Sequence, residues 1–321
     1  MRDGLAAVDG TDRRWQHAQR RLDDTLGWLW DSIANPVLSA VTPDASGPGM
    51  ATRAEGHPAS TAARLWWCPA GLASFLPLHA AGRHGEPGHA VMDHVVSSYT
   101  PTLRALINAR AEARAAAPPG RMLAVALPAT PGLPNLPAAE REARAVAGRV
   151  PGTTTLAGLQ ATRARFLAEL SRHAFLHFAG HGRQDPDDLT SGALYTYDQR
   201  ADGPVTISDL AALRLTDARL AFLSACQTAA GATDVPDEAV HLAGALLLAG
   251  FTHVVATLWA ISDTLAPRVA GEFYPRLMID DQGGSGRLDP AGAARALHDV
   301  IRPLPDQLSS LLWAPYVHIG P

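Results

Sequence analysis

Two short segments of the chain end an apolar run with residues that can carry out nucleophilic chemistry. Residues 174–182 read Ala-Phe-Leu-His-Phe-Ala-Gly-His-Gly, and residues 220–227 read Leu-Ala-Phe-Leu-Ser-Ala-Cys-Gln. Apolar runs of this length are typical of buried parallel strands, whose carboxyl ends face the functional crevice of an α/β sheet. Glycines on both sides of His181 let the backbone turn sharply there. The pattern predicts that His181 and Cys226 lie at the same edge of one sheet.

A histidine beside a cysteine supports one well-defined chemistry. If the two strands are neighbours, their ends lie about 5 Å apart, and the imidazole can take the thiol proton to leave a nucleophilic thiolate. The backbone amides of Gly182 and Cys226 are then candidates to bind the oxyanion of a tetrahedral intermediate. Two plainer interpretations stay open: His181 as a loop residue that caps the sheet, and Cys226 as a small buried thiol.

Another histidine and the second cysteine are expected to be structural. His177 lies within the first apolar run, where burial with a hydrogen bond is the expected role, and Cys68, in Trp-Trp-Cys-Pro at 66–69, is expected to be a buried thiol. A zinc site made from His177, His181 and Cys226 is an alternative, but histidines four residues apart converge only on a helix. A serine hydrolase is disfavoured because the chain has no Gly-x-Ser-x-Gly motif. We therefore expect neither a metal nor an organic cofactor.

The composition excludes several other classes of function. All 27 basic residues are arginine, because the chain has no lysine, and this excludes Schiff-base chemistry and a Walker A phosphate loop. The 31 acidic residues give a formal charge of -4, which argues against direct binding of nucleic acid. Two cysteines are too few for a disulfide framework or a four-cysteine zinc site. No signal peptide follows Met1, so the expected compartment is the cytoplasm.

Apolar runs alternate with helix-like stretches along most of the chain. Six runs are expected to be strands, at residues 64–68, 121–127, 174–179, 219–224, 253–259 and 316–319. The uncharged run 239–261 is long enough to cross a bilayer, but its histidines and Gly250 favour a buried helix followed by a strand, so no membrane contact is expected. The alternation predicts an α/β fold, with a mostly parallel six-stranded sheet sandwiched by helices.

The first sixty residues differ from the rest of the chain. Residues 12–33 have a helical pattern, and residues 42–61 are rich in Pro, Gly, Ser and Ala and are expected to form a loop. We therefore expect an N-terminal helical segment with a loop at 1–60 and one catalytic domain at 61–321. The polar segment 185–203 connects the two candidate strands, and we expect it to contribute to substrate binding or to form an ordinary connection.

Several segments of the chain, in their order and spacing, resemble the CHAT domain family, a caspase-like module of the clan CD cysteine peptidases. The matching segments are Leu-His-Phe-Ala-Gly-His-Gly at 176–182, Leu-Ser-Ala-Cys-Gln-Thr-Ala at 223–229, Val-Ala-Thr-Leu-Trp-Ala-Ile-Ser-Asp at 255–263, Trp-Trp-Cys-Pro-Ala-Gly at 66–71 and Trp-Ala-Pro-Tyr-Val-His-Ile-Gly at 313–320. The resemblance implies a caspase-like sheet sandwiched by helices. It also implies that His181 and Cys226 are the catalytic dyad.

By this resemblance, the chain is expected to be a cytoplasmic cysteine endopeptidase that hydrolyses a specific protein substrate. Many relatives that cleave after basic residues have an acidic residue two places before the cysteine, where this chain has Ser224, so that preference is not implied. Ser224, Asp263 and Asp185 are the candidate substrate-binding residues. Bacterial relatives are linked to antiviral defence, some through gasdermin-like proteins, and the arginine-rich and alanine-rich composition fits a bacterial source. An activating protein partner is possible by the same resemblance, and a non-proteolytic CHAT-fold scaffold or signalling module is the alternative function.

Overall fold

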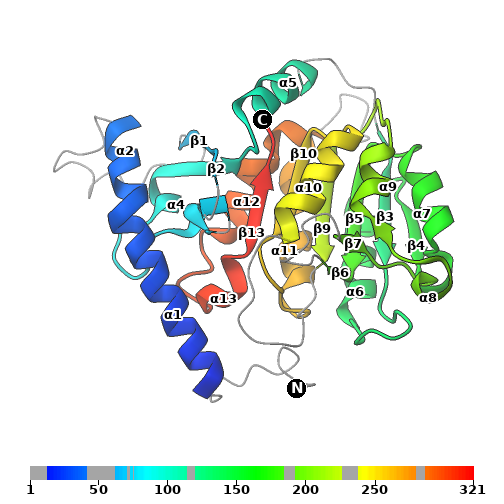
Figure 1. Ribbon diagram of the computed structural model, residues 1–321, viewed down its shortest axis with the longest axis horizontal. Helices are drawn as coiled ribbons and strands as arrows, with labels where there is room; N and C mark the ends of the chain where they lie inside the picture. Colours follow the sequence, from blue (N-terminus) through cyan, green and yellow to red (C-terminus); the bar gives the residue numbers. More distant parts are fainter. Residues whose placement is uncertain are drawn as a thin grey trace.

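The computed structural model describes residues 13–41, 62–70, 73–74, 76–113, 120–183, 192–225, 238–279 and 286–321. Its centre is an eight-stranded sheet in the order β1-β2-β13-β10-β9-β5-β3-β4 (Figure 1). The strands are β1 (Ala63–Trp67), β2 (Val95–Tyr99), β3 (Met122–Ala126), β4 (Thr154–Ala157), β5 (Phe175–Gly180), β9 (Leu220–Ala225), β10 (His253–Thr257) and β13 (Tyr316–Ile319). The predicted α/β fold with a mostly parallel sheet is confirmed.

The sheet consists of two parallel blocks that run in opposite directions. Strands β10, β9, β5, β3 and β4 are parallel to their neighbours, and so are β1, β2 and β13. The two blocks meet where β13 pairs antiparallel with β10. The carboxyl ends of β5 and β9 therefore lie at the edge of the sheet opposite to the carboxyl end of β1.

Two strands of this sheet were not expected from the sequence. All six expected runs are strands, and β2 and β4 bring the number to eight, which corrects the expected six. Strand β2 contains Ser97 and Ser98, and β4 is an edge strand that begins with Thr154 and Thr155. Neither strand has the continuous apolar run that marks a strand buried on both faces.

Helices cover both faces of the sheet. The helices after the N-terminal segment are α4 (Val91–His94), α5 (Leu103–Ala113), α6 (Ala138–Arg149), α7 (Arg163–Leu170), α8 (Gln199–Asp202), α9 (Ile207–Ala212), α10 (Glu238–Ala249), α11 (Ala266–Phe273), α12 (Ala293–Ile301) and α13 (Ser310–Trp313). Helix α6 links β3 to β4, and α10 links β9 to β10. In the strand order these two connections step away from β5 in opposite directions. Because right-handed crossovers in opposite directions lie on opposite faces, α6 and α10 cover different faces. Helix α6 contacts α11, which in turn contacts α12.

Short elements fill the connections between the main strands and helices. They are η5 (Leu78–Ala80), η6 (Gly158–Gln160), η7 (Tyr274–Leu277), η8 (Pro290–Gly292), a three-stranded sheet of β6 (Gly182–Arg183), β7 (Ala193–Leu194) and β8 (Val205–Thr206), and a two-stranded sheet of β11 (Met278–Ile279) and β12 (Arg287–Leu288). Strand β6 begins two residues after β5 ends. The small sheet therefore continues the chain directly from the end of β5.

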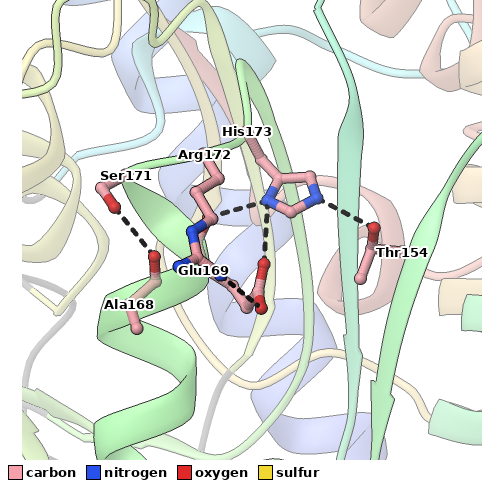
Figure 2. Close-up of polar contacts among 6 residues, drawn as sticks. All are labelled: Thr154, Ala168, Glu169, Ser171, Arg172 and His173. Atoms are coloured by element: carbon pink, nitrogen blue, oxygen red, sulfur yellow. Dashed lines mark hydrogen bonds and ion pairs between the residues drawn. The ribbon is translucent and has the colours of Figure 1, made fainter.

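A polar junction holds the end of α7 against the start of β5 (Figure 2). The buried His173 uses Nδ1 to donate to the carbonyl of Glu169 at 2.7 Å, and its Nε2 forms a hydrogen bond with the hydroxyl of Thr154 on β4 at 2.9 Å. One imidazole thus joins a helix end to the edge strand of the sheet. This junction lies directly before the start of β5.

The N-terminal helix packs onto the same core as the sheet. It runs through α1 (Arg13–Leu29), a π-helical turn η1 (Trp30–Ala34) and α2 (Asn35–Val41), and it forms the long blue rod at one side of Figure 1. Leu26, Leu29 and Leu38 are buried in the cluster that also contains the strand residues. The expected loop at 42–61 lies outside the described residues, and a domain boundary near residue 60 stays a prediction.

The long uncharged run separates into a helix and a strand, as expected. Helix α10 ends at Ala249, Gly250 has a φ of 125°, and β10 begins at His253. A side chain at Gly250 would also collide with the carbonyl oxygen of Leu215. Within the described part of the chain, none of the helices has the length and apolar character needed to span a bilayer.

Candidate active site

The two strands that carry the candidate dyad are neighbours. Strand β5 pairs parallel with β9, and Gly180 is in register with Ala225. His181 follows the first of these residues, and Cys226 follows the second. Cys226 itself lies outside the described residues. The expectation that the two strands are adjacent, with the same ends at the same edge, is confirmed.

The imidazole of His181 has a defined protonation pattern. The residue is only 2% exposed, and Nε2 lies 2.8 Å from the carbonyl oxygen of Pro134. Because a carbonyl only accepts, Nε2 carries the proton and Nδ1 presents a lone pair. Nδ1 is buried and has no hydrogen-bond partner among the described residues. Burial lowers the pKa of His181, and the bond to Pro134 opposes that shift. A neutral imidazole with Nδ1 free is a proton acceptor.

The loop that supplies this carbonyl was not anticipated from the sequence. It follows β3, the other neighbour of β5, and reads Pro-Gly-Leu-Pro-Asn-Leu-Pro at 131–137. Leu127 donates to the carbonyl of Ala179 at 2.9 Å, so the ladder continues past the end of β3, and Leu136 donates to the carbonyl of Pro128 at 2.8 Å. The sequence signal was a proline-rich turn directly after a buried strand, which places a loop at the same sheet edge as His181.

Gly182 lies against the end of β9. A Cβ atom built on Gly182 would be 3.5 Å from both the Cβ and the carbonyl oxygen of Ala225. The backbone N–H of Tyr195 donates to the carbonyl of His181 at 2.9 Å, so these two residues form a hydrogen-bonded pair, and the next pair in the ladder is Gly182 with Leu194. Because bonded and non-bonded pairs alternate in an antiparallel ladder, the amide of Gly182 points away from β7. That amide therefore faces the side of β6 that lies away from β7.

The candidate substrate-binding residues have different surroundings. Ser224 is 7% exposed and is in register with Ala179. The carboxylate of Asp263 accepts from the backbone N–H of Ala138 at 3.1 and 3.3 Å, at the start of α6. The pKa of Asp263 is raised, mainly by burial. The hydrogen bond from Ala138 opposes this shift, and the negative charge of Glu142 adds to it. Asp185 lies outside the described residues. Asp263 therefore meets the helix that follows the Pro134 loop.

His177 is buried in a polar cluster, as expected. It is fully buried, with Nδ1 3.0 Å from the hydroxyl of Tyr274 and Nε2 3.3 Å from a carboxylate oxygen of Glu142. Burial and the charge of Glu142 raise the pKa of Tyr274 well above its usual value. His177 thus turns to α6 and η7, whereas His181 turns to the Pro134 loop. The two histidines do not share a partner among the described residues.

The expectation of a buried Cys68 is wrong. Cys68 is exposed, and its thiol lies 3.8 Å from the carbonyl oxygen of Pro101. It follows β1, which is an edge strand and runs in the block opposite to β9. The thiol of Cys68 is therefore accessible, and it lies at the other edge of the sheet from the candidate site.

The sequence matches the family model of the CHAT domain over residues 23–321. The chain belongs to the CHAT domain family. The matched range includes most of the N-terminal helix as well as the whole sheet, which agrees with the packing of Leu26 and Leu29 into the common core. None of the curated proteins compared with this CHAT domain matches it significantly.

The comparison with solved structures matches this chain to a separase–securin complex and to two structures of a gingipain. The separase–securin complex of Saccharomyces cerevisiae matches with a TM-score of 0.49 and 14% identity, covering 77% of this CHAT domain and 14% of that chain. The Arg-specific cysteine proteinase gingipain R matches with a TM-score of 0.48 and 10% identity, covering 95% and 75%. The complex of the pro- and mature domains of Porphyromonas gingivalis RgpB matches with a TM-score of 0.49 and 11% identity, covering 96% and 76%.

Proposed function

We propose that this protein is a cysteine endopeptidase whose catalytic dyad is Cys226 and His181. The observation that carries the proposal is the register of β5 and β9, together with the state of His181. The residue before each dyad member is paired across the sheet, and the Nδ1 lone pair of His181 is buried without a partner among the described residues. A buried, unprotonated nitrogen next to the strand end that leads to a cysteine suits a general base.

In the proposed mechanism, Nδ1 of His181 takes the thiol proton of Cys226, and the sulfur attacks the scissile carbonyl carbon. The negative charge that develops on the carbonyl oxygen is held by the backbone amides of Gly182 and Cys226. His181 then returns its proton to the nitrogen of the leaving amine, and the C–N bond breaks to leave a thioester. Water, activated by the same Nδ1, hydrolyses the thioester and regenerates the thiol.

Pro134 has a defined part in this proposal. Its carbonyl accepts a hydrogen bond from the Nε2–H group of His181 at 2.8 Å, which keeps Nδ1 as the basic nitrogen throughout the cycle. The same carbonyl stabilises the imidazolium that forms when Nδ1 is protonated, because the imidazolium donates more strongly. No metal or organic cofactor enters any step.

The proposed substrate is a specific protein, bound near Ser224, Asp263 and the segment that begins with Asp185. Asp263 supports this role because it is an acidic group near the site with only a backbone donor, Ala138, bonded to its oxygens among the described residues. We extend the proposal to a cytoplasmic bacterial protease in regulation or antiviral defence, with a gasdermin-like protein as a candidate substrate and control by a protein partner. The basis of this extension is the family and the arginine-rich, lysine-free composition.

The test compares protein N-termini in cells that express the wild type or Cys226→Ala. New N-termini present only with the wild type report both the substrate and the cleaved bond. A second assay labels the purified protein with an electrophilic peptide probe in a Cys68→Ser background, since the exposed Cys68 would otherwise react as well. Equal sets of N-termini, with no probe labelling of Cys226, would refute the proposal and favour the scaffold alternative.

A further inference from the structure

The Pro134 loop begins with a turn whose geometry depends on one peptide group. Leu133 donates to the carbonyl of Thr130 at 3.0 Å, and Gly132 has a φ of 88°. Proline at the second position and a glycine with positive φ at the third define a type II turn over residues 130–133. Types I and II differ in the orientation of the central peptide, whose carbonyl here belongs to Pro131.

A side chain from another part of the chain holds that carbonyl. Nε2 of Gln199, on α8, donates to the carbonyl oxygen of Pro131 at 2.6 Å. The guanidinium group of Arg200 packs directly over Gly132, because a Cβ built there would lie 2.4 to 2.9 Å from it. The donor from Gln199 favours the type II orientation of the peptide between Pro131 and Gly132. The turn therefore depends on α8 for its conformation.

Helix α8 is itself anchored firmly. The carboxylate of Asp198, the residue before it, accepts from the backbone N–H of Arg163 at 2.9 and 3.1 Å and from the hydroxyl of the buried Thr196 at 2.8 Å. The backbone N–H of Tyr197 donates to the carbonyl of Ala161 at 3.0 Å. These bonds attach the segment to the start of α7. Gln199 therefore extends from a fixed support.

The same segment also holds the backbone of the candidate catalytic histidine. The backbone N–H of Tyr195 donates to the carbonyl of His181, and Gln199, four residues further along the chain, donates to the carbonyl of Pro131. Pro131 is three residues before Pro134, which accepts the Nε2 proton of His181. Residues 195–199 thus hold both the histidine and the loop that bonds to its side chain. The distance between them is set by one short, anchored segment.

We propose that Gln199 is a positioning residue that keeps His181 in the tautomer with the proton on Nε2, by holding the 130–133 turn and hence the Pro134 carbonyl. Without the donor from Gln199, the central peptide of the turn can rotate, and Pro134 no longer offers a fixed acceptor. The imidazole then populates the tautomer with the proton on Nδ1, which cannot take a proton from a thiol. The relevance of this inference to catalysis rests on the proposed function, but the tautomer itself can be measured without any activity.

The experiment records the imidazole nitrogen signals of protein labelled with ¹⁵N-histidine. The chain has 13 histidines, so the signals of His181 are identified by their loss in His181→Gln. In the wild type we expect a protonated Nε2 and an unprotonated Nδ1. In Gln199→Met, which keeps the length of the side chain but has no donor, we expect the Nδ1–H form to appear.

The matched control is Gln307→Met. Nε2 of Gln307 donates to the carbonyl of Pro303 at 3.2 Å, which is the same type of bond on an exposed surface of the molecule. We expect the His181 signals of Gln307→Met to match those of the wild type. Unchanged His181 signals in Gln199→Met would overturn the inference. If that variant does not fold, Gln199→Glu serves in its place, because a carboxylate also cannot donate, and the same two outcomes decide.

A kinetic measurement on the identified substrate separates this inference from the proposed function. We expect Gln199→Met to lower kcat by about tenfold with little change in KM, a part of the usual contribution of a general base. If Cys226→Ala retains activity while Gln199→Met changes the tautomer, the proposed function fails and the positioning stands. If Cys226→Ala is inactive while Gln199→Met leaves both kcat and the tautomer unchanged, only the positioning fails.

Discussion

Acidification from pH 7 to pH 5 should destabilise this protein strongly, because burial in the fold lowers the pKa of four histidines besides His181. Burial is the main cause in each case, and it lowers the pKa of His79 and His298 to about 4, that of His253 to about 3, and that of His318 well below its usual value. His253 and His318 also share a hydrogen bond of 3.1 Å and both face the positive charge of Arg64. All four lie around β10, β13 and α12 or in η5.

The sign and size of the effect follow from linkage. A histidine whose folded pKa is depressed binds a proton more readily in the unfolded chain, so its stabilisation is complete above about pH 6.5 and is lost as the pH falls toward the folded pKa. For a folded pKa of about 4, as for His79 and His298, the loss between pH 7 and pH 5 is about 2 kcal/mol each. Counting His253 and His318 as one coupled group adds a similar amount. The total of about 6 kcal/mol is comparable to the 5–15 kcal/mol stability of ordinary domains.

Urea unfolding at a series of pH values, followed by the fluorescence of the 7 tryptophans, measures this directly. We expect the free energy of unfolding to fall by several kcal/mol with an unchanged dependence on urea concentration. In His298→Gln, which cannot titrate, the fall over the same range should be about 2 kcal/mol smaller. The reasoning is refuted if the variant and the wild type lose stability in parallel, or if neither loses stability above pH 5.

Three further predictions concern the site and its surroundings. Gly132→Ala and Gly152→Ala both force alanine into a positive φ, of 88° and 73°, at a backbone cost of about 1–2 kcal/mol each. At Gly132 the new Cβ also displaces the guanidinium of Arg200, whereas Gly152 has open space around it. Only Gly132→Ala should slow alkylation of the proposed nucleophile, Cys226, and equal rates would contradict the role of the turn. Glu142→Ala should cost about 1–3 kcal/mol in urea unfolding, because it removes the polar group that lies 3.3 Å from Nε2 of the buried His177; a cost below about 0.5 kcal/mol would contradict that role. Cys68 should be alkylated in the native protein, as measured by mass spectrometry of digested peptides, and protection until unfolding would contradict its exposure.

Local patterns in the sequence were sufficient to predict most of the fold and to select His181 and Cys226 as the candidate dyad, whose role stays a prediction. Continuous apolar runs and helical periodicity predicted six of the eight strands and the principal helices between them. The reason is that a strand buried on both faces needs apolar residues at every position, and this is visible in the sequence. The runs that end at Gly180 and Ala225 also predicted that His181 would lie at a strand end beside β9. Strands β2 and β4 were missed because serine and threonine interrupt or replace the apolar signal.

The remaining features depend on contacts between distant parts of the chain, which no local pattern encodes. The reversed direction of β1, β2 and β13 places Cys68 on the opposite side of the sheet from the candidate site, and Cys68 is exposed there although its apolar neighbours in the sequence suggested burial. The acceptor for His181 is a backbone carbonyl, and any residue type can supply one, so Pro134 carried no signal of its own. The sequence by itself determined which side chains could react. The order of the strands and the packing of the 131–137 loop decided which nitrogen of His181 carries the proton, because tautomers are set by the partners that the tertiary fold brings within hydrogen-bond distance.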